Sequence, residues 1–274
     1  TYSYDMLGEA ALTSKDATGY FHSYCDAIRA LAKNAKSPDM TRNPGISIKL
    51  SALHPRYEVG QTERVMDELV PRVRELAVLA KNSNMGLNID AEEADRLDLS
   101  LDVIEAVLSD SALSGWDGFG IVVQAYGQRA GAVIDWLYDL AAQHDRRIMV
   151  RLVKGDYWDT EIKRAQEQGL DGYPVFTRKV STDVSYLACA QRLLECGEMI
   201  YPQFATHNAH TAAAIMQMAG ARGDLEFQRL HGMSDGLHRR LAVQHGFATR
   251  TYAPVGRHKE LLPYLVRRLL ENGA

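Results

Sequence analysis

The sequence predicts a single-domain (β/α)8 barrel of the TIM type. Eight short runs rich in Val, Ile, Phe and Tyr alternate with longer stretches of helical period from one end of the chain to the other. The length of 274 residues is also typical of one such barrel. An open doubly wound sheet would usually carry a glycine-rich phosphate loop after its first strand, and none is present. The barrel is therefore favoured, with residues 1–274 as one domain.

The predicted strands are apolar because parallel strands in this fold are covered on both faces. They comprise residues 3–7, 46–50, 86–90, 120–124, 148–154, 199–207, 225–233 and 249–255. Amphipathic helices are expected between them, and residues 63–81 are typical, with apolar side chains recurring at helical spacing. Pro71 should bend or shorten that helix. Residues 169–174 break the region after the fifth strand into two helices, and a last helix is expected over 258–272, before Gly273.

Composition excludes several classes of protein. Thirty-one basic and thirty-five acidic residues give a net charge of −4, with no basic stripe for a nucleic acid. No apolar run spans a membrane and no signal peptide opens the chain, so a cytoplasmic protein is expected. The three cysteines lack metal or disulfide spacing. The missing initial methionine suggests a catalytic core taken from a longer protein.

Polar side chains end nearly every predicted strand, where the active site of this fold forms. They are Glu9, Lys49, Asp90, Gln124, Arg151 with Lys154, His207 with Asn208, and Tyr252. Each alone could be a solvated loop residue or half of an ion pair. Their occurrence at seven strand ends together predicts a polar site.

The last predicted helix carries a second polar group. Tyr264, Arg267, Arg268 and Glu271 share one face, since they lie at i, i+3, i+4 and i+7. This stripe could be a solvated surface, but two arginines beside a tyrosine suit bidentate capture of a carboxylate or phosphate. The flanking leucines at 261, 262, 265, 269 and 270 are expected to pack against the barrel.

Two strand ends have the parts of a cofactor site. Residues 151–158 combine basic side chains, a glycine and two aromatic rings, which could hold a planar, anionic cofactor. Residues 206–210 open a helix whose amides can receive a phosphate. His207 and His210 could instead bind a metal, although no carboxylate is near them in sequence. Lys49 and Lys154 could alternatively be Schiff-base nucleophiles of an aldolase.

Seven longer strings carry a family resemblance: KLSALHPRY, NIDAEEADRL, VVQAYGQRA, RLVKGDYWDTEIKRAQ, PQFATHNAHT, EFQRLHGM and YLVRRLLENG. They resemble the proline dehydrogenase domains of bacterial bifunctional proline utilization enzymes, over essentially the whole chain. The resemblance implies a barrel that binds FAD and oxidises L-proline to Δ1-pyrroline-5-carboxylate, the first step of proline catabolism to glutamate. It also implies electron transfer to a membrane quinone, an aldehyde dehydrogenase domain in the parent protein, and a cytoplasmic location compatible with peripheral attachment to the inner membrane.

The resemblance also assigns roles to residues. Arg151, Asp90 and Lys49 would be catalytic, with Arg151 near flavin N5. Lys49, Arg267 and Arg268 would hold the proline carboxylate, with Glu9 pairing with Arg267 as a lid. The pyrrolidine ring would be enclosed by Tyr157, Leu230, Tyr252 and Tyr264. The remaining flavin contacts would be Gln124, Val153, Lys154, Gly155, Trp158, Thr177, Lys179, Thr206, His207, Asn208 and Glu271, and no metal is expected.

One residue departs from the family pattern. Asp156 stands where the family commonly has Ala, beside the pocket-forming Tyr157. A carboxylate there could repel the substrate carboxylate or compete for the arginines, so weaker proline binding is expected. A Schiff-base aldolase and a catalytically silent barrel module remain the alternatives to a flavoenzyme.

Overall fold

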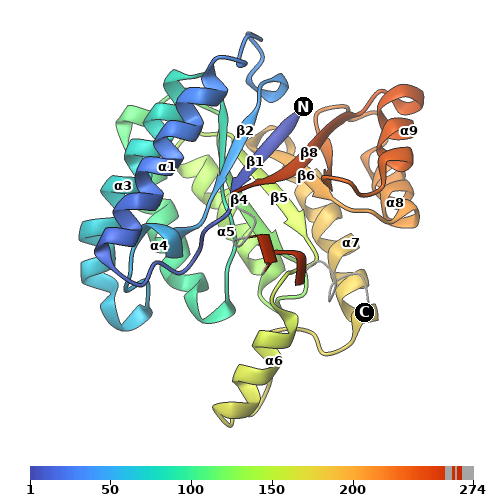
Figure 1. Cartoon of the computed structure of the whole chain (residues 1–274). Coiled ribbons are helices and arrows are strands. Elements are labelled where there is room, and N and C mark those ends of the chain that lie inside the picture. Colours follow the sequence, from blue (N-terminus) through green and yellow to red (C-terminus); the bar gives the residue numbers. More distant parts are fainter. Residues whose placement is uncertain (257–260, 263, 267–274) are drawn as a thin grey trace.

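Eight parallel strands close into a barrel in the order of the sequence, with β8 paired to β1 (Figure 1). The structure, a computed structural model, describes residues 1–256, 261–262 and 264–266. All eight predicted strands are present, and the predicted (β/α)8 fold is confirmed. The strands are β1 (Tyr2–Met6), β2 (Gly45–Ile48), β3 (Gly86–Ile89), β4 (Phe119–Gln124), β5 (Ile148–Val153), β6 (Ile200–Ala205), β7 (Glu226–Leu230) and β8 (Ala248–Val255).

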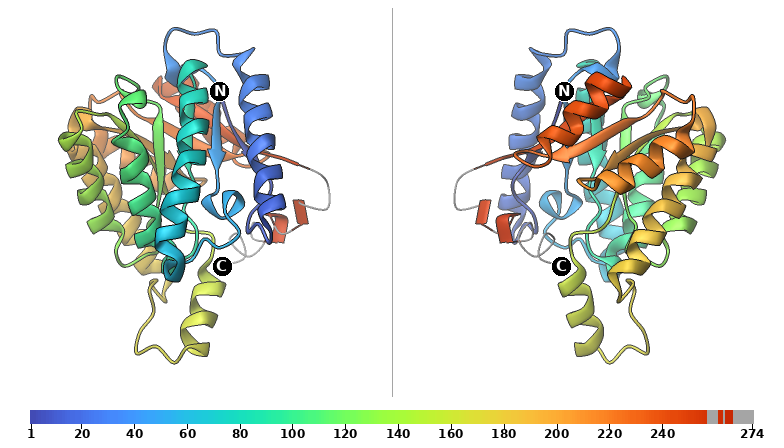
Figure 2. Two further views of the ribbon diagram at one scale, coloured as in Figure 1. Left: turned by 90° about the vertical axis from the view of Figure 1, so that its left-hand side faces the viewer. Right: turned by 90° about the vertical axis from the view of Figure 1, so that its right-hand side faces the viewer.

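Helices surround the barrel between successive strands (Figure 2). They are α1 (Ser14–Ala32), α2 (Leu50–Leu53), α3 (Thr62–Asn82), α4 (Leu97–Leu108), α5 (Ala130–Gln143), α6 (Trp158–Glu167), α7 (Lys179–Glu195), α8 (Ala209–Ala219) and α9 (Asp235–His245). The break after the fifth strand is confirmed, since α6 and α7 are separate. In both views α6 projects from the end of the barrel opposite the N-terminus. None of these described helices is long and apolar enough to cross a membrane.

Helix α3 shows that the expected shortening at Pro71 is wrong. The helix runs for 21 residues with Pro71 inside it. Its buried face includes Val65, Leu69, Val73 and Leu76, whereas Pro71 lies on the exposed face. Water can hydrate the backbone carbonyl that loses its partner there, while the buried face keeps the helix in place.

The inside of the barrel is polar. Asn88 on β3 donates across it to Oε1 of Gln203 on β6, at 3.0 Å. Arg151 on β5 donates from Nη1 to Ser47 Oγ and from Nη2 to Ser3 Oγ, at 3.0 and 3.2 Å. Barrels of this type usually fill their interior with layers of Val, Ile and Leu. This one instead carries a hydrogen-bonded network along its axis.

The hydrophobic core lies between the strands and the helices. Side chains that alternate with the polar ones along the strands point outward, and Ile46, Ile48, Phe119, Phe204 and Phe227 are fully buried there. Because both faces of most strands are covered, the rigid barrel can hold buried charges at fixed positions.

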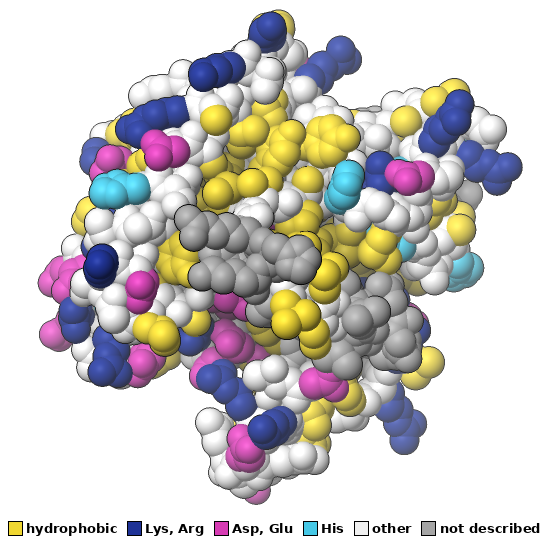
Figure 3. Space-filling view, in the orientation of Figure 1, with side chains coloured by type: hydrophobic (Ala, Val, Ile, Leu, Met, Phe, Trp, Pro, Cys, Tyr) yellow, Lys and Arg dark blue, Asp and Glu magenta, His cyan; other side chains and the backbone are white. Residues whose placement is uncertain are grey.

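The outer face of β1 and β8 is the exception. No described helix lies over these strands between α1 and α9 (Figure 1). Figure 3 shows hydrophobic side chains gathered on this face of the molecule. Tyr2 is 43% exposed and its ring stacks on that of Tyr4, with centroids 5.8 Å apart. The polar site described next lies on the other side of these strands, inside the barrel.

Candidate functional site

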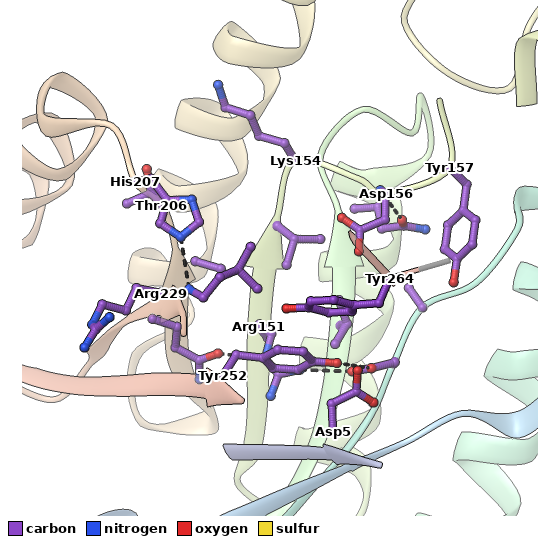
Figure 4. Close-up of a pocket in the computed structure, with 18 of the residues that line it drawn as sticks. Asp5, Arg151, Lys154, Asp156, Tyr157, Thr206, His207, Arg229, Tyr252 and Tyr264 are labelled. Atoms are coloured by element: carbon purple, nitrogen blue, oxygen red, sulfur yellow. Dashed lines mark hydrogen bonds and ion pairs between the residues drawn. The ribbon is translucent and has the colours of Figure 1, made fainter. Parts of the chain in front are cut away.

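A cavity of about 320 Å³ opens at the carboxyl ends of the strands. Most of the residues predicted from the sequence lie around it (Figure 4). They are Lys49, Asp90, Gln124, Arg151, Val153, Lys154, Tyr157, Lys179, Thr206, His207, Asn208, Leu230, Tyr252 and Tyr264. Residues from β2 to β8 and from the last helix therefore converge on one space.

Alternating charges form the floor of this cavity. Lys49 Nζ lies 3.1 Å from Asp5 Oδ1 and 3.0 Å from Asp90 Oδ2. The other oxygen of Asp90 accepts from Arg151 Nη1 at 2.9 Å. The Tyr252 hydroxyl donates to Asp90 Oδ2 at 2.8 Å, and the Arg151 guanidinium lies 5.0 Å from the centre of the Tyr252 ring. Four buried charges thus form one chain, Asp5–Lys49–Asp90–Arg151, which we call the acid–base chain.

Burial and neighbouring charges fix the protonation states of Lys49, Asp90 and Tyr252. Burial opposes the charge on Lys49, but the carboxylates of Asp5 and Asp90 outweigh it and hold the pKa of this ammonium well above its ordinary value. Burial also opposes the charge on Asp90, yet Lys49 and Arg151 keep the pKa of its carboxyl below the ordinary value. Burial raises the pKa of Tyr252, so its hydroxyl stays protonated and donates. Lys49 and Asp90 are therefore held in their charged forms at neutral pH.

These contacts disfavour an aldolase. A Schiff-base lysine needs a depressed pKa so that its amine is free to attack a carbonyl. Lys49 is instead held as an ammonium between two carboxylates. Lys154 forms an ion pair with Asp183 and is not deeply buried.

The Arg151 guanidinium is fixed from several sides. Its Nε donates to Gln228 Oε1 at 2.7 Å, and Nη1 donates to both Ser47 and Asp90. Nη2 donates to Ser3. One N–H of Nη2 has no acceptor among the described residues, so a cationic donor is available at the cavity.

The turn after β5 depends on Gly155. Its φ of +134° is rarely adopted by other residues, and a Cβ at this position would lie 2.5 Å from the Tyr126 ring. The glycine at this position is thus required by the close approach of the Tyr126 side chain. The turn brings Asp156 to the cavity, where its backbone N–H donates to Gln124 Oε1 at 3.3 Å.

The end of β6 leads into α8 as predicted. Asn208 caps the helix, accepting from the Thr211 N–H at 3.1 Å. The Leu230 N–H donates to His207 Nε2 at 3.0 Å, so the proton of the neutral His207 ring lies on Nδ1. Within the part of the chain that the structure describes, no three His, Cys, Asp or Glu residues come together as a metal site.

Some predicted residues lie elsewhere. Glu9, Gly155, Trp158 and Thr177 are not among those that line the cavity. Trp158 is 41% exposed, and its Nε1 donates to the Phe176 carbonyl at 2.9 Å. Arg267, Arg268 and Glu271 lie outside the described residues, as does the expected end of the last helix at Gly273.

Two of the leucines expected to pack the last helix against the barrel are exposed. Leu262 and Leu265 are 64% and 45% exposed, so packing of the barrel through these leucines is wrong. Tyr264 is buried and lines the cavity, in agreement with its expected place at the site. The large polar-tipped ring occupies the barrel mouth because the cavity beneath it is itself lined by aromatic and polar groups.

Three polar or charged lining residues were missed in the sequence. Asp5 is the carboxylate of the acid–base chain on β1, and Gln228 and Arg229 come from β7. A signal for two of them exists, because Ser3 and Asp5, and Glu226 and Gln228, are polar residues at every second position of a strand. That spacing places them on one face.

Comparisons with known proteins agree with this geometry. A family model described as proline dehydrogenase matches residues 1–274. The chain is 59% identical over 281 residues to the bifunctional protein PutA of Klebsiella aerogenes, covering all of this chain and 21% of that protein. A crystal structure of a Bradyrhizobium japonicum proline utilization A variant matches with a TM-score of 0.97 and 60% identity, covering 100% of this chain and 28% of the other. Proline utilization A from Bdellovibrio bacteriovorus, inactivated by N-propargylglycine, matches with a TM-score of 0.94 and 34% identity, covering 100% and 30%.

Proposed function

Because the chain belongs to the proline dehydrogenase family, we propose that it oxidises L-proline to Δ1-pyrroline-5-carboxylate with a bound FAD. The observation that carries this proposal is the ionised acid–base chain on the cavity floor, beside Tyr252 and beneath Tyr264. Such a site combines buried cations for an anionic substrate with aromatic walls for a small apolar ring.

The residues around the cavity fit an anionic, planar cofactor. Arg151 offers a buried cationic N–H on the floor. Lys179 and the first amides of α8 lie on another side of the cavity and suit phosphate groups. We assign the flavin contacts to these groups and to Gln124 and His207. When bound, FAD supplies the acceptor for the hydride that leaves proline C5.

The protein's own part is to position the substrate and exclude water. Lys49 gives the pocket a charged, buried ammonium for the proline carboxylate, and we assign Arg267 and Arg268 to the same task. Tyr157, Leu230, Tyr252 and Tyr264 would enclose the ring. Holding the carboxylate at several donors sets both the distance and the orientation of the reacting carbon.

We further propose that the chain acts within a longer bifunctional protein. It spans only about a fifth of the length of the PutA relative from Klebsiella aerogenes. In the same proposal an aldehyde dehydrogenase domain of that protein receives the product, and a membrane quinone receives the electrons. Peripheral attachment to the inner membrane would then bring the site to its acceptor.

The decisive test is optical. The purified protein is expected to be yellow, and anaerobic L-proline should bleach the flavin absorbance, whereas D-proline should not. FAD released on denaturation is quantified in the same sample. Colourless protein without extractable FAD would refute the flavoenzyme, and borohydride trapping of a carbonyl substrate on Lys49 or Lys154 would support the aldolase instead.

Asp156 gives a prediction about affinity. Changing Asp156 to Ala is expected to lower the KM for proline by about three- to tenfold, because it removes a carboxylate from a cavity that binds a carboxylate. Steady-state kinetics of both proteins measures this. Asp159→Ala, which removes an exposed carboxylate from the first turn of α6, is the control. A KM that stays the same or rises in Asp156→Ala would contradict the prediction.

A further inference from the structure

A second buried ion pair lies below the cavity, on the inner faces of β7 and β8. Arg250 Nε lies 2.8 Å from Glu226 Oε1 and 3.1 Å from Oε2, and both side chains are at least 95% buried. The Nη groups of Arg250 donate to the backbone carbonyls of Thr41, Asn43 and Tyr2, at 2.6, 3.0 and 3.3 Å. Neither Arg250 nor Glu226 lines the cavity. The pair therefore anchors the barrel floor without touching the site.

Glu226 nevertheless reaches the site through one side chain. Gln228 Nε2 donates to Glu226 Oε1 at 2.6 Å, and Gln203 Nε2 donates to the same oxygen at 3.0 Å. The amide of Gln228 is thereby oriented, with Nε2 toward the carboxylate and Oε1 away from it. Gln228 Oε1 is the atom that accepts from Arg151 Nε, at 2.7 Å.

The opposite orientation of this amide is unfavourable at both ends. A flipped Gln228 would bring its oxygen against the Glu226 carboxylate and its NH2 against the Arg151 guanidinium, which is donor-only. Each mismatch leaves a buried polar group without its partner. The Glu226 carboxylate thus fixes the amide orientation in which Gln228 Oε1 accepts from Arg151 Nε.

We propose that Glu226 is a positioning residue that acts through Gln228 to hold the Arg151 guanidinium in one orientation at the cavity. The proposal rests on the proposed function in one respect, since its consequence for a redox potential requires bound FAD. Its consequence for Arg151 itself does not. Both consequences can be measured on the same proteins.

Glu226→Gln is the first test, since it keeps the shape of the side chain and removes the charge that orients Gln228. The first readout is hydrogen exchange at the Arg151 Nε–H, followed by 15N NMR in the purified 274-residue protein, whatever its FAD content. The protection factor of this N–H should fall about tenfold. With FAD bound, the two-electron midpoint potential of the flavin should fall by about 30 mV, which corresponds to a tenfold smaller equilibrium constant for its reduction. We expect kcat to fall while the KM for proline stays within about twofold.

Two further variants separate positioning from a purely structural role. Glu161→Gln is the matched control, because Glu161 is also buried and accepts from the Ala94 N–H, but on α6 outside the barrel. It should leave the Arg151 signal and the potential unchanged. The double variant Glu226→Leu/Arg250→Met replaces the ion pair by apolar side chains of similar volume, which often preserves stability.

The double variant keeps the test decisive if Glu226→Gln folds poorly. A folded double variant in which the Arg151 Nε–H has also lost its protection from hydrogen exchange supports the positioning role. Normal protection of that N–H in any folded variant without the Glu226 carboxylate would overturn it. Absence of FAD from the wild-type protein would count against the proposed function alone, because the NMR result is read without the flavin.

Discussion

Replacing Arg151 with Met is expected to lower kcat for proline oxidation at least about 100-fold, the usual cost of losing a preorganised donor in a buried site. Arg151 is the only described residue whose guanidinium both pairs with Asp90 and lines the cavity. In the proposed flavoenzyme its cation would favour the negative charge that a reduced flavin gains. The two-electron midpoint potential of the bound FAD should therefore fall in parallel with kcat.

Arg151→Lys tests whether charge or geometry matters. Lysine keeps the charge but cannot donate to Gln228, Ser47 and Asp90 together, because it lacks the planar fork of guanidinium. We expect a kcat between those of wild type and Arg151→Met. Arg222→Met is the control for arginine removal, since Arg222 donates to the backbone carbonyls of Leu194, Gly197 and Ile200. It also lies 3.9 Å from Asp224 and does not line the cavity. This control variant should lower Tm and spare kcat, and a wild-type kcat in Arg151→Met would contradict the assigned role.

The eight strands could be predicted because outward side chains dominate their composition. Residues such as Ile46, Ile48 and Phe204 pack under helices and make each strand apolar enough to recognise. The polar residues between them carry the information about the interior. Ser47 between two isoleucines, and Arg151 between Val150 and Leu152, show the period of two, but only closure of the barrel places them in one space.

Strand ends were informative about the site because closure of the barrel brings them together. The fold brings all carboxyl ends to one rim, so Lys49, Asp90 and Tyr252 meet although they are up to 203 residues apart, from 49 to 252. Asp5 was missed because a carboxylate within the first strand could equally face solvent. Its pairing with Lys49 depends on the parallel pairing of β1 with β2.

The last helix illustrates a limit of periodicity. The spacing of Tyr264, Leu262 and Leu265 shows which side chains share a face, but both faces are partly apolar. Which face is buried depends on where the helix lies. Tyr264 faces the barrel mouth, where a hydroxyl-bearing ring meets a polar cavity.

Charge balance within the acid–base chain explains why more cations are needed for an anionic substrate. Asp5 and Asp90 together neutralise Lys49 and Arg151, so the chain itself has no net charge. A substrate carboxylate adds a further negative charge to a buried space, which is costly unless another cation pairs with it. This requirement supports the assignment of Arg267 and Arg268 to the substrate, from the sequence spacing that placed them on the face of Tyr264.

Lys49→Met should therefore have two separable effects. It leaves the buried carboxylates of Asp5 and Asp90 without the cation between them, which is expected to cost about 3–5 kcal/mol of the free energy of unfolding. It also removes an ammonium from the cavity, so the KM for proline should rise at least about tenfold. Denaturant unfolding and steady-state kinetics measure the two effects independently.

A second substitution separates stability from substrate binding. Adding Asp5→Asn to Lys49→Met removes one of the two stranded carboxylates, so most of the lost stability should return. The KM should stay high, because neither change restores a cation to the pocket. A double variant that recovers both stability and a wild-type KM would mean that Lys49 only holds the carboxylates apart, and that the substrate carboxylate is bound entirely by other cations.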